Sequence, residues 1–340
     1  MKIVVDCHGN DFGAKVAVEA SVKVTNEHED ISIVLCGLEG EIRDILSTLD
    51  YDENRIEICP ATEIITNEES PTEAIKKKKD SSLVKAYEKL KEDKEVVGLV
   101  SCGSTGAVLT GAVLKIGRIK GISRPALCPM LPTKNGGKVL LIDSGANVDC
   151  KPINLSHFAM MASSYAKAYL NINNPRVALL NIGTEDKKGN EFSHECFQLL
   201  KKTPVNFVGN MEARDFLSGD YDIVVADGFD GNILLKSVEG TAKFVMGEIK
   251  QSIKDSFMSK IGALFMKNTF KHLKQTFDVS SHGGAVFLGV KKLIVKGHGA
   301  SNSSSFENCI LQVRTLAQFE LCKKIEQEIT LLGDRLDGIV

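Results

Sequence analysis

The sequence predicts an α/β fold with three layers, in which helices cover both faces of a mostly parallel sheet. Short apolar segments rich in Val, Ile and Leu alternate with helical patterns along the chain. Four of these segments end in small, polar, glycine-rich turns. Parallel strands are buried on both faces and therefore read as continuous apolar runs, so both observations favour this class.

Nine segments fit strands of this kind. They are Ile3 to Asp6, Ile31 to Cys36, Ile56 to Cys59, Val96 to Ser101, Val139 to Asp143, Val177 to Ile182, Val205 to Val208, Ile223 to Ala226 and Leu293 to Lys296. We expect one unit over residues 1–340. If it forms two lobes, the proline- and glycine-containing segment 125–137 marks their boundary. A final helix is expected from Phe306 to Leu332, ending at Gly333.

The four glycine-rich turns lie at 101–107, 143–149, 182–190 and 226–232, each directly after a predicted strand. Ligands bind at the carboxyl ends of parallel strands, and a helix that follows presents free N–H groups to an anion. Phosphate or a phosphorylated substrate is therefore the expected ligand. Any one of these turns has an equally ordinary explanation, since Gly, Ser, Thr and Asn also cap helices and form tight turns.

Composition narrows the class of protein further. The 340 residues include 43% hydrophobic and 25% charged residues, as expected of a globular chain, and the net charge of -2 argues against a general nucleic-acid binder. A strand is expected at the N-terminus in place of a signal peptide, and no apolar run approaches the length of a membrane span. We therefore expect a cytoplasmic protein with reduced cysteines. The cysteines and histidines lack the spacing of zinc ligands, so we expect no metal site. We also expect no cofactor.

The region 242–275 has an amphipathic helical pattern. Apolar residues recur at three-to-four spacing, and lysines lie outside that stripe. The apolar residues are Val245, Ile249, Ile253, Phe257, Ile261 and Leu264, and the lysines are Lys250, Lys254, Lys260, Lys267, Lys271 and Lys274. A pair of basic amphipathic helices is predicted. They either pack on the sheet or on a dimer partner, or they touch anionic lipid or an acidic protein.

The ordered motifs closely resemble one family, the bacterial acyl-acyl-carrier-protein:phosphate acyltransferases (the PlsX family). The resemblance covers nearly the whole chain. It rests on the residues Asp6, Gly9 and Asp11, on the segments 78–82, 101–107, 117–127, 143–149, 180–191, 209–215 and 227–232, and on His282 to Ala285 and Lys296 to Gly299. It implies a fold similar to the isocitrate and isopropylmalate dehydrogenases and to phosphotransacetylase. It also implies a cytosolic homodimer, loosely associated with the inner face of the plasma membrane.

The implied reaction moves a long acyl chain from acyl carrier protein onto inorganic phosphate, giving acyl phosphate for a membrane glycerol-3-phosphate acyltransferase in phospholipid synthesis. Such a reaction requires a pocket for a dianion and hydrogen-bond donors for the carbonyl oxygen. We expect phosphate or substrate contacts from Asp6, Gly9, Asp11, Gly103, Ser104, Thr105, Gly106, Asp143, Gly145, Asn147, Lys187, Asn190, Gly228 and Gly231.

Four residues are expected to be catalytic. Lys188 supplies positive charge, Asn232 donates to the carbonyl oxygen, Asp227 orients a partner or acts as a base, and His298 moves a proton. Three of them also have a structural explanation: Lys188 as a solvated loop lysine, Asn232 as turn asparagine and His298 as a structural histidine. The acidic carrier protein, or an anionic membrane, is expected to contact Lys250, Lys254, Lys260, Phe257 and Lys267.

Three other functions are compatible with parts of the pattern. A short-chain acyltransferase acting on acyl-coenzyme A would use the same pocket chemistry. A dehydrogenase has the fold alone in its favour, because no G-x-G-x-x-G follows the first predicted strand. A non-catalytic scaffold at the membrane surface is suggested by His8, Asn10 and Ser104, which, like Ala300, depart from the family pattern, and by the basic helices.

Overall fold

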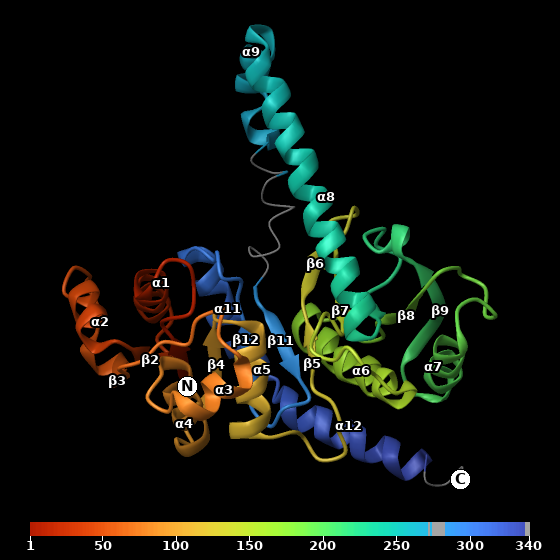
Figure 1. Cartoon of the computed structure of the whole chain (residues 1–340), viewed down its shortest axis with the longest axis horizontal. Helices are drawn as coiled ribbons and strands as arrows, with labels where there is room; N and C mark the ends of the chain where they lie inside the picture. Colours follow the sequence, from red (N-terminus) through yellow and green to blue (C-terminus); the bar gives the residue numbers. More distant parts are fainter. Residues whose placement is uncertain (271–272, 274–282, 337–340) are drawn as a thin grey trace.

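The computed structural model describes residues 1–270, 273 and 283–336 of the chain. Two sheets, each flanked by helices, lie side by side, and a long helix projects away from them (Figure 1). The predicted α/β class with mostly parallel strands is therefore confirmed, although the strands form two sheets instead of one. The chain passes from one sheet to the other at Pro129, inside the segment 125–137.

The first sheet has seven strands in the order β3-β2-β1-β4-β12-β11-β5. Their bounds are β1 (Lys2–Asp6), β2 (Ser32–Gly37), β3 (Ile56–Pro60), β4 (Val96–Ser101), β5 (Ala126–Cys128), β11 (Ala285–Leu288) and β12 (Leu293–Lys296). Neighbouring strands from β3 to β12 pair in parallel, whereas β11 is antiparallel to both β12 and β5. The late strand β12 is thus inserted beside β4, near the middle of the sheet.

Helices cover both faces of this sheet. One buried core lies beneath α1 (Ala14–Glu27), α2 (Glu39–Leu46) and α11 (Ser303–Gln318). A second lies beneath α3 (Pro71–Lys77), α4 (Ser82–Glu92) and α5 (Thr105–Gly111), which a π-helical turn (Ala112–Ile116) continues. A short 3-10 turn, Glu53–Arg55, precedes β3. Alternate strand residues enter one core or the other, as Ile3 and Val4 do.

The second sheet has five strands in the order β6-β7-β10-β8-β9. They are β6 (Met130–Pro132), β7 (Lys138–Ile142), β8 (Arg176–Asn181), β9 (Asn206–Glu212) and β10 (Ile223–Val225). One face packs on α6 (Pro152–Tyr165), with its π-helical extension Ala166–Leu170, and on α7 (Glu191–Lys202). The other packs on the start of α8 (Gly228–Asp255). A 3-10 turn, Ala213–Asp215, follows β9. Because α6 shares its core with the first sheet, the two halves pack together.

Two helical predictions are corrected by the structure. The amphipathic region begins earlier than 242, because α8 is one helix of 28 residues from Gly228, followed by α9 (Phe257–Phe265). The predicted Lys271 and Lys274 lie outside the described residues. The expected single helix from Phe306 to Leu332 is two helices, α11 and α12 (Leu321–Leu336), separated where Glu320 has φ 54°. The second continues through Gly333.

The outer part of α8 and α9 stands clear of both sheets (Figure 1). Many of its apolar residues are exposed, among them Phe244, Phe257, Met258, Leu264 and Phe265, the last at 85% of its full area. Of the alternatives for this region, packing on the sheet is therefore not found among its described residues, and contact with a dimer partner, lipid or an acidic protein stays a prediction. Across the described part of the chain, we find no helix with the length and apolar character that crossing a membrane requires.

Candidate active site

A cavity of about 330 Å³ lies between the two sheets, at the carboxyl ends of their central strands. Thr105 of α5 and the end of β12 contribute from the first sheet, and the β7–α6 loop and α8 contribute from the second. The lining residues with polar side chains are Thr105, Ser144, Asn232, Lys236, Glu239, Lys296 and His298. Of the four predicted catalytic residues, two meet here, Asn232 and His298.

Two lysines supply positive charge to this cavity. Lys296 ends β12, and burial lowers the pKa of its ammonium group. Among the described residues, no carboxylate forms an ion pair with it. Lys236 reaches the cavity from the opposite side on α8, and its Nζ is 2.8 Å from Glu239 Oε2. A partly buried ammonium group without a counter-ion is a favourable partner for an anion.

His298 lies on the loop after β12, at the rim of the cavity. Its Nδ1 accepts a hydrogen bond of 3.1 Å from the backbone N–H of Ala300. Desolvation, followed by the charge of Lys296, lowers the pKa of His298 below the usual value of 6.5. The ring is therefore neutral at pH 7 and carries its proton on Nε2, which makes it a hydrogen-bond donor.

Asn232 lies in the first turns of α8 and faces the β7–α6 loop. Its side-chain amide forms no hydrogen bond with the described residues and lines the cavity. A Cβ atom at Gly145 would lie 3.4 Å from this amide, and the φ of 124° at Gly145 also favours glycine. Gly145 therefore lets the loop pass close to an amide that is free to bind a ligand.

Asp6 belongs to a buried hydrogen-bond chain beneath the site. Ser101 Oγ donates to its carboxylate at 2.7 Å, and the backbone N–H of Gly103 donates to Ser101 Oγ at 3.1 Å. The carboxylate is 1% exposed, and desolvation raises its pKa from 3.8 to about 6. Asp6 therefore supports the loop before α5 and is too deeply buried for the predicted phosphate contact.

The residues predicted in the loops after β1 and β4, other than Thr105, lie near the cavity without lining it. A Cβ atom on Gly9 would lie 2.9 Å from the Cα atom of Gly103, so two glycines allow the β1 and β4 loops to touch. The backbone N–H of Asp11 donates to the carbonyl of Gly299 at 3.0 Å. Ser104 precedes α5 without a side-chain capping bond, and Gly106 packs against Pro71. These contacts join the loops after β1, β4 and β12.

Asp143 and Asn147 are structural in this fold. The carboxylate of Asp143 is fully buried and accepts four hydrogen bonds, from the backbone N–H groups of Leu127, Ala146 and Asn147 and from Asn147 Nδ2. Asn147 Nδ2 also donates to the carbonyl of Pro125 at 2.7 Å. Both amide hydrogens of Asn147 are thus engaged, so the expected contacts of these two residues with phosphate or substrate are corrected to loop organisation.

Gly228, Gly231 and Asp227 fix the start of α8. Asp227 Oδ1 accepts from the backbone N–H of Asp230 at 2.8 Å, as an N-cap does. Desolvation raises the pKa of this carboxyl group. A Cβ atom on Gly228 would lie 2.5 Å from the carbonyl oxygen of Asn147, and one on Gly231 would strike the carbonyl oxygen of Asp143. The glycines permit close packing, and the catalytic role of Asp227 stays a prediction.

Lys187 and Lys188 lie on an exposed loop and do not line the cavity. The loop is tied to its own strand, since Asn181 Nδ2 donates to the carbonyl of Lys188 at 3.0 Å. Asn190 caps α7 by accepting from the backbone N–H of Ser193 at 2.9 Å. The two lysines follow β8, and β10 separates β8 from β7, whose following loop lines the cavity. The strand order therefore keeps both lysines away from the cavity. The predicted roles of the two lysines stay predictions.

Two residues that departed from the family pattern have structural partners. His8 is buried, and its Nε2 accepts from the backbone N–H of Leu38 at 3.0 Å. Asn10 holds its own loop, donating to the carbonyl groups of Cys7 and Gly13 and accepting from the N–H of Phe12. Both substitutions therefore brace the β1–α1 loop without reaching into the cavity.

The sequence interpretation missed Lys236 and Lys296 as site residues. Lys296 begins the motif Lys296 to Gly299, so its position directly before His298 was an available signal. Lys236 and Glu239 follow Asn232 by four and seven residues, the spacing of one helical face. That signal depended on knowing that α8 begins at Gly228.

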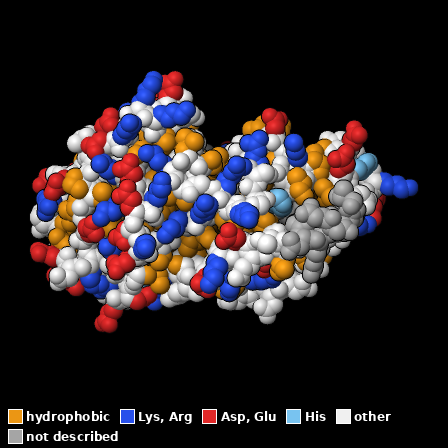
Figure 2. Space-filling view, turned by 90° about the horizontal axis from the view of Figure 1, so that it is seen from below, with side chains coloured by type: hydrophobic (Ala, Val, Ile, Leu, Met, Phe, Trp, Pro, Cys, Tyr) orange, Lys and Arg blue, Asp and Glu red, His pale blue; other side chains and the backbone are white. Residues whose placement is uncertain are grey.

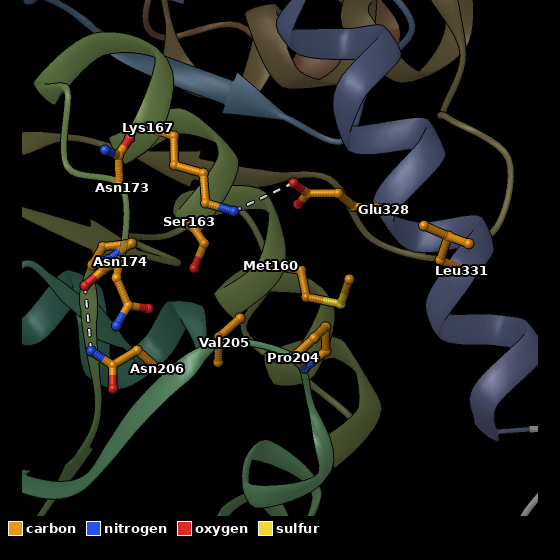
Figure 3. A pocket seen from close by; sticks show the side chains of 11 residues that line it. Met160, Ser163, Lys167, Asn173, Asn174, Pro204, Val205, Asn206, Glu328 and Leu331 are labelled. Carbon is orange, nitrogen blue, oxygen red and sulfur yellow. Dashed lines mark hydrogen bonds and ion pairs between the residues drawn. The ribbon is translucent and has the colours of Figure 1, made fainter.

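A second cavity, of about 220 Å³, lies elsewhere, at the amino ends of β8 and β9 (Figure 3). Asn206 Nδ2 donates to the carbonyl of Asn174 at 3.3 Å, and Lys167 lies 3.6 Å from Glu328 of α12. None of the predicted site residues lines it. The described residues also hold no cluster of three or more His, Cys, Asp or Glu side chains suited to a metal ion.

The chain is similar to known proteins over nearly its whole length. The family model described as "Fatty acid synthesis protein" matches residues 1–324. A phosphate acyltransferase from Clostridium tetani is 44% identical over 97% of this chain and 98% of its own length. One from Thermoanaerobacterium thermosaccharolyticum is 44% identical over 99% of both chains.

Solved structures show the same fold. The structure of a phosphotransacetylase from Streptococcus pyogenes superposes with a TM-score of 0.62 and 18% identity, covering 94% of each chain. That identity supports likeness of fold alone, whereas the family model and the relatives with 44% identity extend over nearly all of the sequence. The chain therefore belongs to the fatty acid synthesis protein family and, within it, to the phosphate acyltransferases.

Proposed function

We propose that the enzyme transfers a long acyl chain from acyl carrier protein to inorganic phosphate, releasing acyl phosphate for phospholipid synthesis. The observation that carries this proposal is the convergence of Lys236, Lys296, Asn232 and His298 in one cavity between the sheets. Two ammonium groups suit a phosphate dianion, and two uncharged donors suit an oxygen on which charge develops.

Phosphate lies between the two lysines in this mechanism. Lys296 binds it from the end of β12, Lys236 binds it from α8, and the Thr105 hydroxyl donates from the start of α5. Binding of the dianion supplies the charged partner that Lys296 lacks and favours the protonated ammonium group. Holding phosphate here also orders the nucleophile next to the thioester, which lowers the entropic part of the barrier.

The thioester carbonyl lies against Asn232 and His298. A phosphate oxygen attacks the carbonyl carbon, and the carbonyl oxygen becomes an oxyanion that accepts from Asn232 Nδ2 and from His298 Nε2. The C–S bond then breaks, and the proton of the attacking hydrogen phosphate passes to the departing thiolate through solvent. The chemistry needs no nucleophile from the protein, in keeping with a cavity whose polar side chains bind and donate.

The test is to incubate the purified enzyme with palmitoyl-acyl carrier protein, with and without phosphate, and to trap acyl phosphate as a hydroxamate. Hydroxamate that requires both phosphate and the carrier-linked donor is expected. Palmitoyl-coenzyme A and acetyl-coenzyme A serve as competing donors. A preference for acetyl-coenzyme A would replace the proposal with short-chain transfer, and absence of product with every donor would favour the scaffold.

We further propose that the outer part of α8 and α9 is a contact surface for a second copy of the chain, for acyl carrier protein or for an anionic membrane. Exposed Lys250, Lys254 and Lys260 accompany exposed apolar residues such as Phe257, whose side chain is 76% exposed. Lys267 is also exposed. Elsewhere on the surface, basic and acidic side chains are interspersed, as on the face shown in Figure 2.

Light scattering, carrier-protein titration and flotation with phosphatidylglycerol vesicles distinguish these three contacts. Reversal of charge in Lys250→Glu/Lys254→Glu is expected to weaken carrier or vesicle binding, whereas Phe257→Asp is expected to disrupt a dimer. Unchanged mass, carrier affinity and vesicle binding would contradict the proposal. A peripheral position at the cytoplasmic face of the membrane, near a glycerol-3-phosphate acyltransferase, would follow from the vesicle result.

A further inference from the structure

Two cysteines are paired side by side at the edge of the first sheet, away from the cavity. Cys36 of β2 and Cys59 of β3 are register partners on neighbouring parallel strands. Cys36 is fully buried and Cys59 is partly exposed, because β3 is the edge strand. We propose that the pair is a redox-active modification site, at which a peroxide oxidises Cys59 and Cys36 then closes a disulfide.

The geometry of the pair suits a disulfide. Register partners on parallel strands are separated by the strand spacing of about 4.8 Å, which lies within the Cα separation that a disulfide spans. Both side chains face the core beneath α4, so their sulfur atoms lie on one side of the sheet.

The surroundings of Cys59 make it the nucleophile of the pair. Interaction with the Cys36 thiol, followed by the charges of Lys89 and Lys85 on α4, lowers the pKa of Cys59 to about 7, against burial and Glu57. The lysines also have carboxylate partners, since Lys85 lies 3.0 Å from Asp80 and Lys89 pairs with Glu57. Burial raises the pKa of Cys36 far above its usual value, so Cys36 stays a thiol.

The other partly exposed cysteines provide the contrast. Burial raises the pKa of Cys150 to about 11 and that of Cys322 to about 12. At neutral pH those two are thiols, and only the thiolate is an effective nucleophile. Among the cysteines, therefore, Cys59 alone combines access from solvent with a stabilised thiolate and a neighbouring thiol.

The oxidation balances with hydrogen peroxide as the oxidant. The Cys59 thiolate attacks one peroxide oxygen, the O–O bond breaks, and the products are a sulfenic acid and hydroxide. Cys36 then attacks the Cys59 sulfur, its proton leaves with the hydroxyl group as water, and the S–S bond forms. Two thiols lose two electrons and one peroxide is reduced, and a dithiol reductant reverses the step.

The first test is limiting alkylation of the whole enzyme with iodoacetamide at pH 7, followed by peptide mass spectrometry. Cys59 is expected to react at least about tenfold faster than Cys150 or Cys322, on the basis of its thiolate fraction. Equal rates at the three residues would overturn the proposal. This measurement uses the unaltered protein, so it does not depend on whether a cysteine variant folds.

The second test is treatment with hydrogen peroxide. A peptide joined through Cys36 and Cys59 is expected, two hydrogens lighter than its parts and released by dithiothreitol. Cys36→Ser should instead leave a Cys59 sulfenic acid that dimedone traps, and Cys59→Ser should leave Cys36 unmodified. Cys150→Ser is the matched control and should form the same disulfide. Oxidation of Cys59 to no greater extent than Cys150, or a disulfide between other cysteines, would refute the pair.

Discussion

Asp6 and Ser101 are register partners on β1 and β4 and share a hydrogen bond of 2.7 Å at the carboxyl ends of their strands. Lys296 of β12 is the register partner of Ser101 on its other side. A buried carboxylate, a hydroxyl and a partly buried ammonium group thus follow one another across three neighbouring strands. The Asp6 carboxylate holds the loop before α5 through Ser101, and the Lys296 ammonium group lines the cavity.

Substitution of Asp6 tests the energetic consequence of its burial. The folded-state pKa of about 6 is above the unfolded value near 3.8, so the contribution of Asp6 to stability is full below pH 3.8 and falls as the pH rises through 6. The loss corresponds to about 3 kcal/mol. The variant Asp6→Asn lacks this pH-dependent contribution to the free energy of unfolding. The stability of the wild-type protein relative to the variant should therefore decline between pH 4 and pH 7 in urea unfolding, and a constant difference would contradict the shift.

Substitution of Lys296 tests the proposed phosphate site. Lys296→Gln removes a charged donor from the cavity, and we expect the KM for phosphate to rise about 10- to 100-fold. The same change at exposed Lys188 is the matched comparison, and its effect should be smaller in initial-rate measurements over a range of phosphate concentrations. A larger effect at Lys188 would contradict the assignment of Lys296 to the phosphate site and favour the charge contribution that the sequence predicts for Lys188.

The two asparagines next to the β7–α6 loop should behave differently. Asn232→Ala removes a free donor, so we expect kcat to fall about 100-fold with little change in stability. Asn147→Ala removes one of the four hydrogen bonds to buried Asp143 and the side-chain hydrogen bond to the carbonyl of Pro125, and should lower the free energy of unfolding by about 2 kcal/mol. Initial rates and urea unfolding measured on both variants separate the roles. Similar losses of kcat at equal stability would contradict the distinction.

His298 should give the enzyme a component of acid inactivation. Its neutral form donates through Nε2, and its pKa is below 6.5, so protonation at lower pH removes the acceptor that binds the Ala300 N–H and adds a charge near Lys296, Lys236 and Lys243. Glu239 opposes that charge. In His298→Gln, this component of the acid limb of kcat/KM should be absent. An identical profile in wild type and variant would exclude this role.

Two glycines on α8 provide a matched pair for stability. Gly231→Ala places a methyl group against the carbonyl oxygen of Asp143, so we expect a loss of about 2 kcal/mol or more from the shift of the helix. Gly240→Ala faces open space and should stabilise the helix by about 0.5 to 1 kcal/mol. Thermal unfolding of both variants measures the difference. Equal effects would show that α8 moves freely against the β7–α6 loop.

The sequence determined the class of fold and most of its elements. All nine predicted strands are present, because strands buried on both faces require continuous apolar runs. The three that were missed, β5, β6 and β11, have three or four residues and take part in the antiparallel pairs. Such short segments are too brief for a pattern to identify, and Pro129 and Pro132 further disguise the first two.

The tertiary structure decided which residues line the cavity. The glycine-rich turns predicted ligand chemistry at strand ends, and the structure brings two of the predicted catalytic residues, Asn232 and His298, into the cavity. Lys296 lines the cavity because β12, from late in the chain, lies beside β4. Lys188 lies outside it because β10 separates β8 from the cavity. Strand order follows from how whole helices and sheets bury their apolar faces against one another, which no local pattern records.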